Sequence, residues 1–271
     1  MNETRRTEWT ARVESFARDA APRTKPFAVA LVELEPPPLG GRVLDVATGT
    51  GLVAVEAANR VGPTGTVLAT DFIPEWEPHV AAAAADAGVT NVAFATMPAE
   101  SLAVPDASFD VVYCQFGLMF MPDPIGALQE MLRVLRPGGR LGIAVWSVPE
   151  KVGVFLISRI VAPALPPAEG EPPPSPMGMG APGMVEQLVT AAGFQDVAVH
   201  PVTRHYEIAD PEREWQRWSA DLTSPISRGV LALPAGVRQR LHDEVIAAFE
   251  SYREGEIVRV PSEAILVTAV R

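Results

Sequence analysis

The sequence predicts an α/β fold, a doubly wound and mostly parallel sheet of seven strands. Short β-branched and apolar runs alternate with helix-like segments between about residues 42 and 146, and proline- and glycine-rich breaks bound that region. A long helical stretch precedes the last apolar run, which predicts a helical cap inserted between the last two strands. A helical N-terminal cover is expected before the first strand.

Five apolar runs fit strands that are buried on both faces of a sheet. They are RVLDVAT (42–48), TVLATDF (66–72), VAFATM (92–97), FDVVYCQ (109–115) and RLGIAVW (140–146). Because crossover segments separate these runs, the five strands are expected to run parallel. Two further strands, over about residues 196–205 and 264–270, complete the seven.

The clearest helix is predicted between the fourth and fifth strands. From residue 125 to residue 135 the apolar side chains recur on one helical face, and Pro137-Gly138-Gly139 ends the pattern. Neighbouring helices are expected over residues 51–60 and 75–87, and another begins near residue 184 and ends at Gly193. Residues 211–254 are typical of two or three helices.

We expect a single domain over residues 1–271. Its expected parts are an N-terminal helical cover (1–39), a ligand-binding core (40–149), a proline-rich lid or loop (150–182), and the remainder of the sheet (183–271) with the helical cap at about 211–254. Eight of the 20 residues from 163 to 182 are proline, which excludes regular structure there.

Composition and charge exclude several classes of protein. A net charge of −11 without a basic stripe argues against nucleic-acid binding. The single cysteine allows neither an internal disulfide nor a cysteine-based metal site, so no metal is expected. No apolar run reaches the roughly 20 residues that span a bilayer, and no secretory leader is visible, so a cytoplasmic location is expected. The oligomeric state stays open.

A glycine-containing segment, VLDVATGTG (43–51), falls where the first strand turns into the first helix. Gly49 and Gly51 allow the backbone to approach a ligand closely, and the helix N-terminus beyond them offers free N–H groups. Asp71 ends the second strand, where a carboxylate can accept hydrogen bonds from both ribose hydroxyls of a nucleotide. Residues 49–54 also fit the dinucleotide pattern G-x-G-x-x-G/A, which alone is weak.

Asp45 favours a cationic ligand over a dinucleotide. A carboxylate at the end of the first strand would repel two phosphates, whereas it would attract the ammonium and sulfonium groups of S-adenosylmethionine. The alternative is a buried aspartate whose oxygens accept nearby backbone N–H groups.

With these segments in order, the chain resembles the class I S-adenosylmethionine-dependent methyltransferases. The resemblance is closest to the branch around the ubiquinone/menaquinone biosynthesis C-methyltransferases. It rests on VLDVATGTG, on TDF (70–72), on AESLAVPDASFDVVYCQFGLMFMPD (99–123) and on EMLRVLRPGGRLGI (130–143). It covers roughly residues 9–147 and, more loosely, 191–194 and the last strand. It implies a Rossmann-like fold, S-adenosylmethionine as cofactor, and methyl transfer to carbon or oxygen of a small organic acceptor.

The resemblance also implies which residues hold the cofactor. Asp45 and the backbone of Thr48, Gly49, Thr50 and Gly51 would hold the methionine moiety, Asp71 the ribose, Phe72 and Ala99 the adenine with Glu100 close by, and the Cys114 carbonyl the amino group. In one departure, Pro98 stands where relatives often carry an aspartate that binds the adenine amine. The resemblance further places Trp9 and Phe16 in a helix that covers the cofactor.

The acceptor is expected near the ends of the fourth and fifth strands. The candidate contacts are Gln115, Phe116, Met119 and Trp146. His205 and Tyr206 follow the sixth strand and are candidate proton acceptors, although aromatic residues at a strand end are more often structural. The chain lacks the Asn/Asp-Pro-Pro-aromatic segment of amino-group methylators after the fourth strand, which disfavours methylation of DNA bases.

Three alternatives stay open. A relative could use the sulfonium for another reaction such as cyclisation, or could bind the cofactor without catalysis. An NAD-dependent oxidoreductase would fit the glycine pattern but neither Asp45 nor the central segment. Binding of a reduced dinucleotide, and methylated product or its absence, separate these classes.

Overall fold

The computed structural model describes residues 3–166 and 175–271, which fold as two compact units. The first unit holds residues up to 147 together with 174–202 and 264–271, and the second holds 148–173 and 203–263. The single domain expected from the sequence therefore has two structural parts. Within the expected proline-rich lid, residues 167–174 lie outside the described residues.

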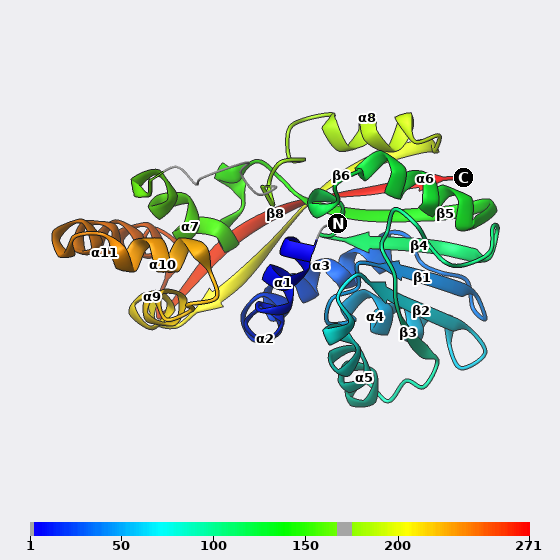
Figure 1. The fold of residues 1–271 in the computed structure, drawn as a ribbon, viewed down its shortest axis with the longest axis horizontal. Helices are drawn as coiled ribbons and strands as arrows, with labels where there is room; N and C mark the ends of the chain where they lie inside the picture. The colour runs from blue at the N-terminus through cyan, green and yellow to red at the C-terminus, as the bar shows by residue number, and fades with distance from the viewer. Residues whose placement is uncertain (1–2, 167–174) are drawn as a thin grey trace. The chain divides into compact units, whose positions relative to one another are not determined.

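One sheet organises the first unit, in the strand order β3-β2-β1-β4-β5-β8-β6 (Figure 1). Its strands are β1 (Arg42–Val46), β2 (Thr66–Asp71), β3 (Val92–Thr96), β4 (Phe109–Gln115), β5 (Leu135–Trp146), β6 (Gln195–Ile208) and β8 (Ile257–Val270). Strands β1 to β5 pair in parallel, and β8 pairs antiparallel with β5. The predicted seven-stranded, mostly parallel sheet is confirmed. A two-residue strand, β7 (Arg253–Glu254), also pairs with β8 and was not predicted.

The order of the strands predicts a ligand site at the carboxyl ends of the central strands. The connection from β3 to β4 crosses to the other side of β1, so the strand order reverses between β1 and β4. Ligands of open α/β sheets bind beyond the carboxyl ends of the strands at such a switch point. The loops after β1, β2 and β4 are therefore the expected site.

Both faces of the central strands are covered. Neighbouring residues of a strand point to opposite faces, and Val43, Leu44, Val111 and Val112 are all fully buried. Helices α3 (Ala21–Leu34), α4 (Leu52–Val61) and α5 (Glu77–Asp86) form one contacting group, and α6 (Pro124–Val134) packs on β5 and on α8 (Met184–Ala191). These two groups of helices pack on the sheet as the predicted doubly wound fold requires.

Helix α6 lies within one residue of its predicted bounds. Asp123 caps its N-terminus by accepting a hydrogen bond from Gly126 N at 2.9 Å. Strand β5 begins earlier than predicted, because Leu135 already pairs with Phe109 before residues 136–139 loop out of the ladder. Pairing resumes at Arg140, where the sequence predicted the strand to start.

Short helices precede α3 and form the predicted N-terminal cover. They are α1 (Glu3–Thr10), α2 (Val13–Ser15) and a π-helical turn (Phe16–Ala20). An edge-on cluster of aromatic rings joins them to the turns after β2 and β4. Its ring centroids lie 6.2 Å apart for Trp9 and Phe16, 5.7 Å for Phe16 and Trp76, and 5.2 Å for Trp9 and Phe120.

The second unit has a hydrophobic core of its own. Helices α7 (Leu156–Val161), α9 (Pro211–Ser219), α10 (Pro225–Ala232) and α11 (Ala235–Glu250) surround it. The three helices from α9 to α11 confirm the predicted helical content of the cap. Helix α7 departs from the loop expected from residue 150, because the prolines begin only at residue 163 and the apolar run before them is buried in this core.

Across residues 3–166 and 175–271, no helix combines the length and the apolar character needed to cross a membrane.

A histidine between two carboxylates joins α11 to α9 within the second unit. His242 Nε2 lies 2.7 Å from Glu212 Oε2, and Nδ1 lies 2.9 Å from Asp243 Oδ1. Hydrogen bonds to these carboxylates raise the pKa of His242 above its ordinary value.

We predict that His242→Gln lowers the melting temperature by roughly 2 °C near pH 6, and that the difference disappears by about pH 9. Because the folded-state pKa is raised, the stabilisation is complete below the unfolded pKa and is lost as pH rises through the folded value. Thermal unfolding followed by circular dichroism at several pH values measures this effect. His200→Gln on β6 is the control, and a difference that grows with pH would contradict the prediction.

Candidate functional site

The glycine loop after β1 wraps around Asp45. This residue is 1% exposed, and its Oδ2 accepts hydrogen bonds from Thr48 Oγ1 at 2.6 Å and from Ala54 N at 3.1 Å. The second donor belongs to the first turn of α4. Asp45 therefore holds the loop and the helix N-terminus together, as the alternative reading of a satisfied buried aspartate expected.

Asp71 joins the same loop to the end of β2. Its Oδ2 accepts a hydrogen bond from Gly49 N, and its Oδ1 accepts one from Ile73 N, both at 3.0 Å. Thr48 N also donates to the Thr70 carbonyl at 2.9 Å. The carboxyl ends of β1 and β2 thus share one hydrogen-bonded loop.

Burial makes ionisation of both carboxyl groups costly. It raises the pKa of Asp45 to about 7 and that of Asp71 to about 6, although the hydrogen bonds oppose the change. The charge of Asp71 raises the pKa of Asp45 further. A cation bound beside the two groups would relieve this cost, whereas an anion would increase it.

Left-handed backbone conformations gather at the ends of β1 and β4. Ala47 has φ +56° and Phe116 has φ +54°, a conformation that residues with side chains rarely adopt. The two loops touch, because a Cβ on Gly117 would lie 2.5 Å from the Ala47 Cβ. Strained backbone of this kind concentrates at ligand sites.

The turn after β3 lies beside the end of β2. Met97 N donates to the Asp71 carbonyl at 2.9 Å, and Ser101 N donates to the Pro98 carbonyl at 3.2 Å. Within this turn Ala99 and Glu100 are half-buried, and the Glu100 Oε1 atom is buried without a hydrogen-bond partner. Polar atoms in this position are usually satisfied, so the oxygen has unused capacity to accept a hydrogen bond.

Phe72 and Cys114 border the site in different ways. Phe72 packs against the aromatic cluster that includes Trp9 and Phe16. The Cys114 side chain is fully buried, and burial raises the pKa of its thiol to about 12. The thiol is therefore protonated at neutral pH. The contact with the cofactor's amino group is predicted for the backbone carbonyl of Cys114, not for its thiol.

The residues predicted to contact the methyl acceptor meet beside α3. Phe116 stacks on Trp146 with ring centroids 3.9 Å apart, and Phe27 of α3 packs edge-on against both rings. Gln115 Nε2 donates to the Thr24 carbonyl of α3 at 3.0 Å, and Met119 is buried nearby in the chain. The structure therefore brings Gln115, Phe116 and Trp146 together.

Sequence reasoning missed Phe27, Ala47 and Gly117. Phe27 belongs to the helical cover, and only its place on the apolar face of that helix could have indicated it. Ala47 and Gly117 show their importance through backbone angles and a close approach between loops. No residue pattern signals such contacts.

His205 and Tyr206 lie on the part of β6 that belongs to the second unit. The Tyr206 hydroxyl donates to the Gly153 carbonyl at 3.0 Å, and its ring packs against the core of that unit. The His205 side chain is exposed. Their role as proton acceptors stays a prediction.

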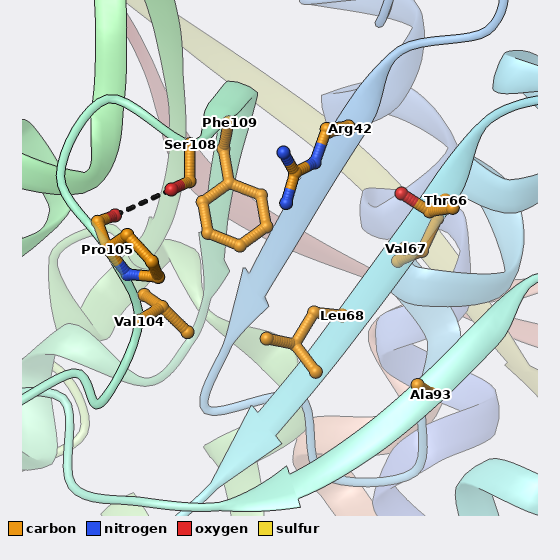
Figure 2. Close-up of a pocket in the computed structure, with 9 residues that line it drawn as sticks. All are labelled: Arg42, Thr66, Val67, Leu68, Ala93, Val104, Pro105, Ser108 and Phe109. Atoms are coloured by element: carbon orange, nitrogen blue, oxygen red, sulfur yellow. Dashed lines mark hydrogen bonds between the residues drawn. The ribbon is translucent and has the colours of Figure 1, made fainter.

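A hollow of about 200 Å³ lies at the opposite, amino ends of the strands. Figure 2 shows the residues that line it. It is lined by the first residues of β1, β2 and β4 and by the loop before β4, where Ser108 Oγ donates to the Pro105 carbonyl at 2.7 Å. Its walls are largely apolar, and the Arg42 guanidinium lies 5.8 Å from the centre of the Phe109 ring. None of the predicted site residues lines this hollow.

Comparison with known proteins places the chain in a family. Residues 44–143 match a family model described as a methyltransferase domain. Nocamycin O-methyltransferase of Saccharothrix syringae is 32% identical over 201 residues, which cover 70% of this chain and 71% of that protein. The ubiquinone/menaquinone biosynthesis C-methyltransferase UbiE of Ectopseudomonas mendocina is 42% identical over 126 residues, which cover 46% and 48%.

Other matches are partial or distant. An uncharacterized protein of Mycobacterium tuberculosis is 37% identical over 151 residues, which cover 55% of this chain and 52% of that protein, so this chain spans about half its length. The crystal structure of YcgJ from Bacillus subtilis aligns with a TM-score of 0.57 at 22% identity, covering 90% of this chain and 98% of that chain. A SAM-dependent methyltransferase from Aquifex aeolicus aligns with a TM-score of 0.54 at 19% identity, covering 96% of each. At these identities the structural likeness shows the fold alone.

A doubly wound sheet with two buried carboxyl groups at its switch point defines a nucleotide-binding α/β protein. The chain belongs to the class I S-adenosylmethionine-dependent methyltransferases and resembles the UbiE branch.

We predict that Gly117→Ala destabilises the protein by about 1–3 kcal/mol and weakens binding of the adenosyl ligand, because the new methyl group would overlap Ala47. Urea unfolding and calorimetric titration with S-adenosylhomocysteine measure the two effects. Gly236→Ala in α11 is the matched control, since nothing lies within 4 Å of its added Cβ. Equal stability of the two variants would contradict the close approach.

Proposed function

We propose that this protein transfers a methyl group from S-adenosylmethionine to carbon or oxygen of a small organic acceptor. The observation that carries the proposal is the pair of buried carboxyl groups of Asp45 and Asp71, which hydrogen-bond to the same glycine loop, because this arrangement favours a cationic ligand that carries a diol. The names of the relatives, a C-methyltransferase and an O-methyltransferase, support both kinds of acceptor atom.

The residues at the switch point fit the cofactor. The Asp71 carboxylate accepts backbone hydrogen bonds from Gly49, Ile73 and Phe72 and has a further lone pair for a ribose hydroxyl. A Cβ on Gly49 would meet nothing within 4 Å, so the loop has open space on that side. We assign the methionine moiety to Asp45 and the backbone of Thr48, Gly49, Thr50 and Gly51, the ribose to Asp71, the adenine to Phe72, Ala99 and Glu100, and the amino group to the Cys114 carbonyl.

When bound, S-adenosylmethionine supplies an electrophilic methyl group. The task of the chain's own residues is to align the acceptor atom with that methyl group and to exclude water. Alignment of this kind can supply about 7–11 kcal/mol in favourable cases. Phe116, Trp146 and Met119 would form the apolar wall for the acceptor, and Gln115 would offer a polar contact. His205 and Tyr206 remain the proposed proton acceptors for an acceptor that must lose a proton.

We predict that S-adenosylhomocysteine binds the wild type and that Asp71→Asn weakens this binding about 10- to 100-fold, as expected for the loss of hydrogen bonds to a charged group. Calorimetric titration measures both affinities, and Asp86→Asn at the end of α5 is the control. NADH is titrated separately. Tight binding of NADH with none of the adenosyl ligands would overturn the proposed function.

Turnover is then tested with S-adenosylmethionine and a panel of phenols, enols and quinols, with mass spectrometry of the products. Cofactor binding without methylated product across a broad panel would favour the non-methylating alternatives. His205→Ala and Tyr206→Ala are assayed in parallel, and unchanged turnover removes either residue as a proton acceptor.

We also predict that affinity for S-adenosylmethionine rises with pH between about 5.5 and 8 and then levels off. The cation favours the ionised forms of Asp45 and Asp71, whose raised pKa values lie near 7 and 6, so binding releases protons in this window. By the same linkage, the raised pKa values cost the unliganded protein stability as pH rises from about 4, the ordinary pKa of an aspartate, to about 7, and the loss levels off above that pH. Calorimetry in two buffers of different ionisation enthalpy counts the protons.

Asp45→Asn is expected to remove the part of the proton release near pH 7. Proton uptake on binding, or affinity that does not change with pH, would contradict the assignment of a cation to these carboxyl groups.

A further inference from the structure

We propose that Glu130 and Arg133 of α6 are positioning residues for the cofactor, because they fix the backbone just after the turn that follows β3 and thereby set the affinity for S-adenosylmethionine. This inference rests on the proposed function, which places that turn beside the cofactor. Neither residue belongs to the proposed cofactor site, and both act through the backbone of Leu102.

The connection from β3 to β4 has no regular structure of its own. Residues 97–108, all of which the structure describes, contain neither helix nor strand, so their backbone N–H and C=O groups need partners on other elements. At the start of the connection, Met97 N donates to the Asp71 carbonyl at 2.9 Å. At its end, Ser108 N donates to the Val134 carbonyl at 2.7 Å. The middle of the connection needs a further anchor.

Leu102 provides this anchor, because both of its backbone polar groups bind side chains of α6. Leu102 N donates to Glu130 Oε2 at 2.8 Å, and the Leu102 carbonyl accepts a hydrogen bond from Arg133 Nη2 at 2.8 Å. Arg133 Nη1 also donates to the Val104 carbonyl at 3.0 Å and to Asp106 Oδ1 at 2.5 Å. Two side chains of one helix therefore hold the connection at residues 102, 104 and 106.

Glu130 and Arg133 also fix each other. They lie three residues apart and hence on one face of α6. The guanidinium donates from Nε to Glu130 Oε1 at 2.7 Å and from Nη2 to Glu130 Oε2 at 2.8 Å. The hydrogen bonds from Arg133 hold the pKa of Glu130 below its ordinary value, so the carboxylate is ionised at neutral pH. This charged, two-point pairing gives the connection a stiff support.

The residue that the pair holds is next to the turn assigned to the cofactor. Leu102 is 4% exposed and directly follows the turn over residues 98–101, which the hydrogen bond from Ser101 N to the Pro98 carbonyl closes at 3.2 Å. The turn is therefore fixed at one end to the strand of Asp71 and at the other to α6. Without the second attachment it would sample other conformations, and the measured affinity would fall with the fraction of binding-competent molecules.

The test is calorimetric titration of S-adenosylhomocysteine into the wild type, Glu130→Gln and Arg133→Lys. Glutamine replaces one of the two carboxylate acceptors by an amide donor, and lysine keeps the positive charge but loses the planar fork. We expect both variants to bind about tenfold more weakly than the wild type, as when the competent fraction falls to about one tenth.

Arg253→Lys is the matched control. Arg253 forms the same kind of fork with Glu250, three residues before it, since Nε and Nη2 donate to the two carboxylate oxygens. Arg253 Nη1 likewise donates to a backbone carbonyl, that of Glu256, at 3.2 Å. Because this pair lies in the second unit, Arg253→Lys should bind S-adenosylhomocysteine with the affinity of the wild type.

A second readout separates positioning from general support of the fold. With an acceptor from the panel of phenols, enols and quinols, the KM for S-adenosylmethionine should rise about tenfold in Arg133→Lys while kcat stays unchanged. The reason is that the turn is in place in every molecule that has bound the cofactor, so the chemical step is the same. A fall of kcat at unchanged KM would contradict a positioning role.

Asp106→Asn covers the case in which the other two variants fold poorly. The Asp106 side chain is 73% exposed, so its replacement removes one contact of Arg133 at little cost to the fold. We expect this variant to bind S-adenosylhomocysteine about threefold more weakly, in line with the loss of one hydrogen bond between charged groups in water.

Two kinds of failure are distinguishable. Wild-type affinity in folded Glu130→Gln and Arg133→Lys, or in Asp106→Asn where those two do not fold, would overturn the positioning role and leave the proposed function standing. Failure of the wild type to bind S-adenosylhomocysteine would overturn the proposed function itself.

Discussion

Asp45 and Asp71 are buried at the carboxyl ends of neighbouring strands, and the geometry of the site depends on how the chain compensates for that burial. Hydrogen bonds from Thr48, Gly49 and Ala54 reach the two carboxyl groups, so the loop after β1 must curl tightly around them. These bonds lower the cost of ionisation without removing it, because both pKa values stay raised. A cation bound beside the two groups would complete the compensation and would couple the stability of the loop to its ligand.

The covering helices depend on the same strand ends. Side chains at two alternate positions of β4 hold both ends of α3, since Tyr113 donates to the Glu35 carbonyl and Gln115 donates to the Thr24 carbonyl. The ring of Phe27 then closes over Phe116 and Trp146. Movement of α3 would break these hydrogen bonds and expose the stacked rings, so α3 is tied to the ends of β4 and β5.

The second unit contributes a separate core to the chain. Strands β6 and β8 are 14 residues long, and each belongs partly to the first unit and partly to the second. The core of the second unit includes residues of α7, α10 and α11 together with Val258 and Val260 of β8, which lie outside the segment of β8 that pairs with β5. Variation of the cap over a constant sheet is a physical route by which one fold accepts different substrates.

The sequence by itself determined the alternation of strands and helices, the bounds of β4 and α6 and the motif residues, because these depend on local periodicity and on glycine and proline. It did not predict α7. Residues 156–161 are helical because their apolar side chains are buried in a core made with segments far along the chain, and the prolines follow only from residue 163. Tertiary structure alone decided the unpaired oxygen of Glu100, the double tether of α3 and the contact of Ala47 with Gly117. These features arise where segments far apart in the chain come into contact. Local sequence patterns do not predict such contacts.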